Sequence, residues 1–169
     1  LHFALMGAVY SQKVLGVTNP RVGLLNIGEE SSKGDELSIE THKLLSQSPL
    51  NFIGNVEGGG IFEGLADVVV CDGFVGNVVL KLSEKVLSLI VNQLRTQIKA
   101  NPMSALGFLL MKQVFENMKK TFDYAEYGGA PLLGIDGTTI ICHGGSSPRA
   151  IRNAIRSARL AVIKNVNEL

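Results

Sequence analysis

One stretch, residues 66–81 with the sequence ADVVVCDGFVGNVVLK, constrains the fold of this chain more than any other. It opens with a short apolar run, residues 66–71, in which Asp67 is the only charge. Continuous β-branched runs of this length are typical of strands buried on both faces of a parallel sheet. Two glycines then enclose a short loop, and apolar residues follow at helical spacing from Val79 onwards. The stretch therefore predicts a strand that leads into a helix through a glycine-containing loop, with free N–H groups for an anion where the helix begins.

Composition sets limits on the class of protein. With 169 residues the chain is long enough for one full-sized core, so we expect a single domain over residues 1–169. A net charge of +1 gives no bulk attraction to nucleic acid, and 46% hydrophobic residues indicate that part of the surface contacts a partner. No apolar run reaches the ~18–20 residues of a membrane span. Cys71 and Cys142 lie in predicted strands and are expected to be buried, reduced thiols, which suits a cytoplasmic protein.

The rest of the chain continues the alternation of strand, loop and helix. Helices are expected over residues 1–15 and, after the N-cap candidates Ser31 and Ser32, in the segment that ends before Pro49. Further strands are expected over residues 21–27, 50–53 and 138–142, and Pro148 begins the last helix at its preferred first position. The predicted fold class is α/β, with a mostly parallel sheet flanked by helices.

Four of the predicted strands end in polar loops that contain glycine: GEESSKG, GNVEGGG, DGFVGN and HGGSS. In parallel α/β sheets such loops emerge at one edge, where ligands bind, so we expect the four loops to converge into one cleft. The chain has neither a GxxxxGK[ST] phosphate loop nor a GxGxxG that opens a βαβ unit, and no cofactor is expected. Its His and Cys residues do not cluster at metal-ligand spacing, so no metal site is expected.

The segments PRVGLLNIGEESSKG, NFIGNVEGGGIFEGLADVVVCDGFVGNVVLK and YGGAPLLGIDGTTIICHG, with the closing helix, resemble the bacterial phosphate acyltransferase family PlsX. The resemblance covers essentially the whole chain, as the C-terminal half of the family's sequence, and we expect a piece of a longer protein. It implies transfer of a fatty acyl group from acyl carrier protein to inorganic phosphate, giving acyl phosphate for phospholipid synthesis. It also implies a three-layer sandwich like those of phosphotransacetylases and isocitrate dehydrogenases, and a homodimer.

Such a reaction needs a site that holds a phosphate dianion and stabilises an oxyanion. Lys33 is the expected cation for either charge, and His143 is expected to donate to the oxyanion or to protonate the leaving thiolate. Asn77 is the third catalytic candidate. No Ser–His–Asp or Cys–His pair is evident, which favours direct attack by phosphate. The expected substrate- and phosphate-binding residues are Asn26, Gly28, Glu29, Glu30, Asn55, Glu57, Asp72, Gly73, Phe74, Gly76 and Gly144.

Each of these residues has a structural alternative. Asp72 is equally suited to cap the helix that follows it, and the loop glycines to permit close packing of strand and helix. Lys33 could be a solvated loop charge, and His143 could form only a hydrogen bond that fixes its loop. The three glutamates of the set carry the same sign of charge as phosphate, so they are expected to hold Lys33 or backbone groups. Cys71 is expected to be a core residue and not a nucleophile.

Residues 82–120 are expected to form a protruding hairpin of two helices, broken at Asn101 and Pro102. The tip of the second helix, SALGFLLM, is apolar nearly all round, with Leu106, Phe108 and Leu109 as the candidate contact residues. A helix that is apolar all round must be buried or partnered. The tip is therefore part of the core, a dimer interface, or a peripheral contact with the inner face of the membrane.

The last helix carries a basic stripe. Its four arginines recur at spacings of three and four beside apolar residues: Arg149, Arg152, Arg156 and Arg159. The stripe is either a solvated face or a docking surface for an acidic partner. Acyl carrier protein is such an acidic partner.

Two other functions stay open at this stage. One is an NADP-dependent dehydrogenase of similar architecture, and the other is a non-catalytic module that supplies dimer and membrane contacts to a longer enzyme. The chain has no nicotinamide-specific loop and no clustered metal-binding aspartates, which favours the acyltransferase.

Overall fold

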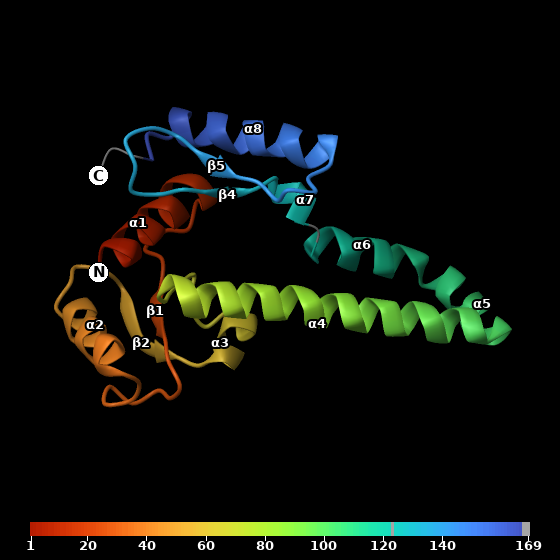
Figure 1. Ribbon diagram of the computed structural model, residues 1–169, viewed down its shortest axis with the longest axis horizontal. Helices are drawn as coiled ribbons and strands as arrows, with labels where there is room; N and C mark the ends of the chain where they lie inside the picture. Colours follow the sequence, from red (N-terminus) through yellow and green to blue (C-terminus); the bar gives the residue numbers. More distant parts are fainter. Residues whose placement is uncertain (123, 167–169) are drawn as a thin grey trace.

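Three parallel strands organise the part of the chain that the computed structural model describes, which is residues 1–122 and 124–166, without the side chains of residues 119–122 and 124. They are β1 (Val22–Leu25), β2 (Phe52–Val56) and β3 (Val68–Val70), in the order β2-β1-β3 (Figure 1). Helix α2 (Glu36–Ser46) connects β1 to β2, and the short helix α3 (Gly58–Glu63) connects β2 to β3. The prediction of an α/β fold with a parallel sheet flanked by helices is confirmed.

Helices cover both faces of this sheet. On one face, Ala4 and Ala8 of α1 (His2–Tyr10) and Leu45 of α2 pack with strand residues into the buried core, whose strand members are Val22, Leu24 and Val70. Gly7 permits this close approach, because a Cβ there would lie 2.7 Å from Val68 Cγ1. On the other face, α3 brings Gly60 against Val56. The helix expected over residues 1–15 is α1 followed by a π-helical turn, η1 (Ser11–Leu15).

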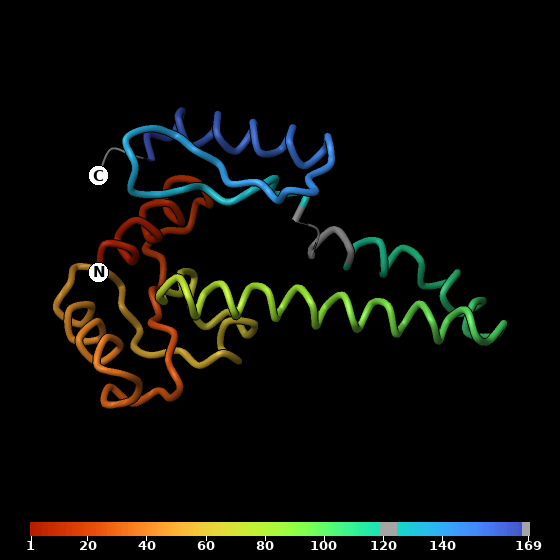
Figure 2. Tube along the Cα trace, viewed as in Figure 1, coloured from red at the N-terminus to blue at the C-terminus, as the bar shows by residue number. Residues whose placement is uncertain are grey.

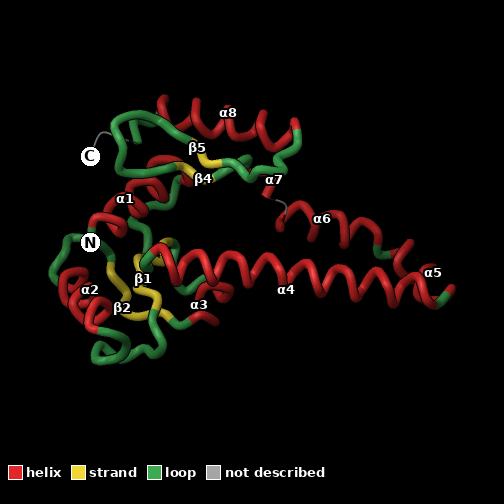
Figure 3. The backbone as a smooth tube through the Cα atoms, in the orientation of Figure 1, coloured by secondary structure: helices red, strands yellow, loops and turns green. Residues whose placement is uncertain are grey.

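The strand expected over residues 138–142 does not join the parallel sheet. It is reduced to β5 (Ile140–Ile141), which pairs antiparallel with β4 (Ala130–Pro131). Figure 3 shows this pair, in yellow, apart from the three parallel strands. Strand β5 packs against α8 (Pro148–Ile163), and α7 (Tyr124–Tyr127) also contacts α8. The expectation that all four strands share one sheet edge is therefore wrong within the described residues.

Helix α1 lies between the parallel sheet and this C-terminal layer, as Figure 2 shows for the red and blue ends of the chain. Gly7 of this helix faces the sheet. The neighbouring Met6 faces the C-terminal layer, where a Cβ added to Gly134 would lie 2.9 Å from the Met6 sulfur. The Lys13 ammonium donates a hydrogen bond of 2.6 Å to the carbonyl oxygen of Asn165 beyond α8. The first and last segments of the chain are thereby held together.

A long helical hairpin projects from the sheet (Figure 1). It consists of α4 (Gly73–Ala100), α5 (Pro102–Leu110) and α6 (Lys112–Phe122). The expected break at Asn101 is confirmed, and the Asn101 side chain caps α5 by accepting from the N–H of Met103. The prediction of one helix after this break is wrong, because that helix is divided at Met111 into α5 and α6. Neither α4 nor α5 has a buried residue, so the interpretation of the tip as core is wrong for this chain. No helix of the described residues combines the length and the apolar character needed to cross a membrane.

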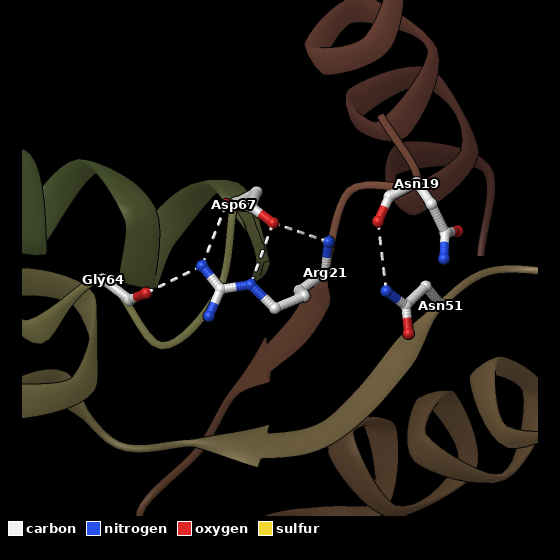
Figure 4. A network of polar contacts seen from close by, with 5 residues as sticks. All are labelled: Asn19, Arg21, Asn51, Gly64 and Asp67. Atoms are coloured by element: carbon white, nitrogen blue, oxygen red, sulfur yellow. Dashed lines mark hydrogen bonds and ion pairs between the residues drawn. The ribbon is translucent and has the colours of Figure 1, made fainter. Parts of the chain in front are cut away.

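A polar network connects the amino ends of the three parallel strands (Figure 4). The Arg21 backbone N–H and Nε donate to one oxygen of the Asp67 carboxylate at 2.8 and 3.0 Å, and its Nη2 donates to the other at 3.0 Å. The same Nη2 donates to the carbonyl oxygen of Gly64. The Asn51 amide at the start of β2 donates to the carbonyl oxygen of Asn19 at 3.1 Å. These bonds fix the strand ends that lie opposite the expected ligand-binding edge.

The first prediction concerns this network. The hydrogen bonds from the Arg21 side chain and backbone hold the pKa of Asp67 below its ordinary value. Because that pKa is lower in the folded than in the unfolded protein, the stabilisation is present above about pH 4 and is lost as pH falls through the folded value. We expect Asp67→Asn to lower the melting temperature at pH 7 by about 2–4 °C. The free energy of unfolding, measured with urea, should also fall less steeply for this variant as the pH is lowered below about 4.

The control is Glu40→Gln, which removes an exposed ion pair of 3.9 Å with Lys43 within α2. Such pairs contribute little, so this variant should unfold like the unchanged protein. If the stability of Asp67→Asn and of the unchanged protein fell equally as the pH is lowered, the pH dependence of stability would not come from Asp67.

Candidate functional site

The loops after β1, β2 and β3 leave the sheet at the same edge, because the three strands are parallel and in register: Leu25 lies beside Val56, and Leu24 beside Val70. Of the four loops expected at this edge, these three therefore emerge there. They carry most of the expected site residues. Ligands of α/β sheets bind at this carboxyl edge.

The loop after β1, residues 27–34, is called here the Lys33 loop. Two of its side chains pack over the backbone of Gly28, which has no side chain of its own. A Cβ at residue 28 would lie 2.9 Å from Oε2 of Glu30 and 3.0 Å from Cγ of Lys33, so both side chains cross this point. Lys33 is exposed and forms no ion pair within the part of the chain that the structure describes. Its ammonium charge is therefore available to an anion.

Two asparagines at the strand ends bind the backbone of this loop. The Asn26 Nδ2 donates to the carbonyl oxygen of Lys33 at 2.9 Å, and its Oδ1 accepts from the N–H of Ile27 at 2.8 Å. Nδ2 of Asn55, a residue only 7% exposed, donates to the carbonyl oxygen of Glu30 at 2.7 Å. Both residues were expected to contact a substrate, and that stays a prediction: both donate their Nδ2 to the loop, whereas Oδ1 of Asn55 is buried and accepts no hydrogen bond from the described residues.

Gly34 shapes the site and was not predicted to do so. Its φ of +95° is a conformation that side-chain-bearing residues rarely adopt, and a Cβ there would lie 2.6 Å from Oδ1 of Asn26. The glycine that follows the lysine in GEESSKG was the available signal. Because the loop extends this far, the N-cap of α2 is Asp35, which accepts from the N–H of Ser38, and the expected caps Ser31 and Ser32 are wrong.

An open pocket of ≈ 370 Å³ lies beside the end of β2. Its lining combines one carboxylate, one amide and apolar groups: Glu29, Ile53, Gly54, Asn55, Val56 and Leu65. Glu57 follows at the N-cap position of α3, where its side chain forms no capping bond. Carboxylates therefore lie on both sides of the edge, because Glu57 follows β2 whereas Glu29 and Glu30 share the loop after β1 with Lys33.

The loop after β3 does not present the free helix N-terminus that the sequence suggested. Oδ1 of Asp72 accepts from the N–H groups of Phe74 and Val75 at 2.8 and 2.9 Å, so the capping alternative for Asp72 is confirmed. Gly73 and Asn77 are exposed, and a Cβ at Gly76 would lie 3.0 Å from the sulfur of Cys71. An anion at this helix end would compete with the Asp72 carboxylate for these two N–H groups.

Cys71 follows β3 and Cys142 follows β5, and both are half-buried, so the expectation of buried thiols within strands is wrong for both. Both are free. Burial, and to a smaller extent the neighbouring Asp72 carboxylate, raise the pKa of the Cys71 thiol. The thiol is therefore protonated at neutral pH, and the expectation that Cys71 is no nucleophile agrees with this environment.

His143 and Gly144 lie in the turn between β5 and α8, and this turn is not part of the sheet edge. Figure 1 places it beside α7, on the far side of α1 from the Lys33 loop. Nδ1 of His143 accepts from the N–H of Gly145 at 3.0 Å, and its carbonyl oxygen accepts from the Ser146 hydroxyl at 2.7 Å. The expected cleft that combines His143 with Lys33 is not formed within the described residues, because β5 pairs with β4 instead of the parallel sheet.

The basic stripe of α8 is exposed, but it is not uniform. Arg149 forms an ion pair with Glu126 of α7, whereas Arg152, Arg156 and Arg159 have no ion pair within the described residues. The buried face of the helix is formed by small residues, Ala150, Ala154 and Ala161. Three arginines of the stripe thus remain available on the outer side of α8.

The fold and this edge define an α/β protein with a candidate ligand site where the parallel strands end. The family model described as "Fatty acid synthesis protein" matches residues 1–169, and the chain belongs to this family. The expected resemblance is thereby confirmed.

The chain is similar to several proteins named phosphate acyltransferase. That of Citrifermentans bemidjiense is 58% identical over 167 residues, which are 99% of this chain and 47% of the relative. That of Syntrophotalea carbinolica is 59% identical over 166 residues, 98% of this chain and 48% of the relative. That of Heliobacterium modesticaldum is 54% identical over 165 residues, 98% of this chain and 49% of the relative. The chain spans about half the length of the curated relatives it matches.

Proposed function

We propose that this chain is the C-terminal half of an acyltransferase that moves a fatty acyl group from acyl carrier protein to inorganic phosphate. The observation that carries the proposal is the identity of 54–59% to proteins named phosphate acyltransferase over nearly the whole chain. The exposed Lys33 at the sheet edge supports it, because an unpaired cation there suits an anionic substrate.

In this reaction a phosphate oxygen attacks the thioester carbonyl carbon, the new C–O bond forms, and the C–S bond breaks with its electron pair on sulfur. The products are acyl phosphate and the thiolate of the carrier, which is then protonated. Lys33 binds the attacking dianion and reduces the negative charge that accumulates at the carbonyl. The protein needs no nucleophile of its own, which agrees with the protonated state of Cys71.

The remaining contacts belong to the same proposal. Arg152, Arg156 and Arg159 form the docking surface for the acidic carrier. The hairpin formed by α4, α5 and α6 contacts either a second copy of the protein or the inner face of the membrane. Support for a partner comes from the exposed apolar side chains along the hairpin, among them Leu89 at 61% and Leu109 at 65%.

The second prediction tests the reaction itself. A full-length protein that carries this chain should consume acyl-carrier thioester only when phosphate is present, and radiolabelled phosphate should appear in an acyl phosphate. The chain by itself serves as the control for a non-catalytic module. Reduction of NADP⁺ without acyl phosphate would favour the dehydrogenase, and phosphate-independent thioester loss would contradict transfer to phosphate.

A further inference from the structure

The backbone of Lys33 is held at both of its peptide groups. Its N–H donates to the carbonyl oxygen of Glu30 at 3.1 Å, and its own carbonyl oxygen accepts from Nδ2 of Asn26 at 2.9 Å. The carbonyl oxygen of Glu30 also accepts from Nδ2 of Asn55 at 2.7 Å. The backbone of Lys33 is therefore bound directly to the Asn26 side chain at the end of β1. It is also linked, through the carbonyl oxygen of Glu30, to the Asn55 side chain near the end of β2.

Asn26 is itself fixed by hydrogen bonds, and Asn55 is restrained by its burial in β2. The N–H of Asn26 donates to the carbonyl oxygen of Val56 at 3.0 Å, which continues the pairing of β1 with β2. Its Oδ1 accepts from the N–H of Ile27, so the orientation that directs Nδ2 towards Lys33 is set. Asn55 lies within β2 and is 7% exposed. Side chains held in this way lose little further entropy when they bind the loop.

The Lys33 loop has few other anchors. Except for the buried Gly28 and the half-buried Gly34, its residues are exposed, so apolar burial does not set its shape. The two asparagine amides supply what burial does not. We propose that Asn26 and Asn55 are positioning residues, which act on phosphate only by holding the Lys33 ammonium at the sheet edge. The inference rests on the proposed function and assigns these residues a role other than substrate contact.

A matched pair of variants tests the proposal in the full-length protein. Asn55→Leu keeps a branched side chain of similar size but donates no hydrogen bond to the loop. Asn51→Leu removes an equivalent amide-to-carbonyl bond, that of 3.1 Å to Asn19, at the opposite end of the same strand. A structural role alone would make the two variants similar. Asn26→Leu removes the second bond to the loop and replaces Asn55→Leu if that variant does not fold.

We expect Asn55→Leu to lower kcat/KM for phosphate by about 10- to 100-fold, because displacement of a charged group by about 1 Å has effects of this size. Asn51→Leu should leave kcat/KM for phosphate unchanged. In the Lys33→Ala background, Asn55→Leu should cause no further loss, since residues that act as a unit are not additive. Losses that multiply would overturn the proposal.

Hydrogen exchange by mass spectrometry supplies a readout that does not depend on activity. Amides of residues 27–34 should exchange faster in Asn55→Leu than in Asn51→Leu. Equal exchange in the two variants would overturn the positioning role even if the enzyme is active. If instead the unchanged protein forms no acyl phosphate while exchange in this loop rises as expected, the proposed reaction fails and the support of the loop by Asn55 stands.

Discussion

Replacing Lys33 by alanine is expected to lower the rate of acyl transfer to phosphate by about 100-fold or more, which is the usual cost of removing one group that stabilises a developing charge. Lys33 is exposed, and its side chain crosses the bare backbone of Gly28 without an ion pair among the described residues. The loop is held by backbone carbonyl groups that the substitution leaves in place. The melting temperature should therefore hardly change.

The measurement is the initial rate against phosphate concentration for the full-length protein. Lys33→Arg should restore part of the rate, because it keeps the charge but changes the geometry of its donors. Lys43→Ala, on the outer surface of α2, is the control for loss of one exposed lysine and should behave like the unchanged protein. A fall in thermal stability that accounts for the fall in rate would indicate that Lys33 has a structural role instead.

The fold was predictable where a local pattern decides the structure. The run before Asp72 predicts β3, and the change to helical spacing after it predicts α4, which begins at Gly73. The sheet to which residues 138–142 belong depends on which strand they pair with. In the structure β5 pairs with residues 130–131 and not with the parallel sheet. Strands of only two residues leave no periodicity in the sequence, so their sheet could not be assigned.

The candidate site was predictable in its residue types but not in their contacts. Polar residues after the strands were found, because such loops meet at one edge. Whether Asp72 binds an anion or its own helix, and whether Asn55 binds a substrate or Glu30, depends on distances of a few ångströms that sequence spacing does not contain. The predicted position of His143 was wrong because this residue lies in the turn directly after β5. Since β5 pairs with β4 and not with the parallel sheet, the turn lies away from the sheet edge.

The helical hairpin exposes many apolar side chains, and a prediction about its tip follows from them. Leu106, Phe108 and Leu109 at the tip are 54%, 37% and 65% exposed, and Phe108 contacts Phe115 of α6 with ring centroids 5.0 Å apart. Replacing the three tip residues by glutamine is expected to abolish binding to vesicles if the tip enters a lipid surface. Loss of each apolar side chain from such an interface removes roughly 1.5–3 kcal/mol, which is enough to release a peripheral protein.

A second variant separates the membrane from a second copy of the protein. Val86, Leu89 and Ile90 lie on the stem of the hairpin, in α4, and are 45%, 61% and 51% exposed. Polar substitutions there should weaken an interface between two copies that runs along the stem, whereas they should leave insertion of the tip unchanged. Vesicle flotation beside light scattering on both variants reports the two properties together.

The outcomes differ because the two surfaces differ in place. A membrane-binding tip predicts that the tip variant loses flotation and keeps its oligomeric state. A dimer formed along the hairpin predicts that the stem variant becomes monomeric, and that neither variant has any flotation to lose. Since α4 and α5 bury no residue in this chain, neither variant should unfold unless a partner segment covers the hairpin. Retained flotation of the tip variant would end the membrane hypothesis, and unfolding of both variants would show that the hairpin is covered within the full-length protein.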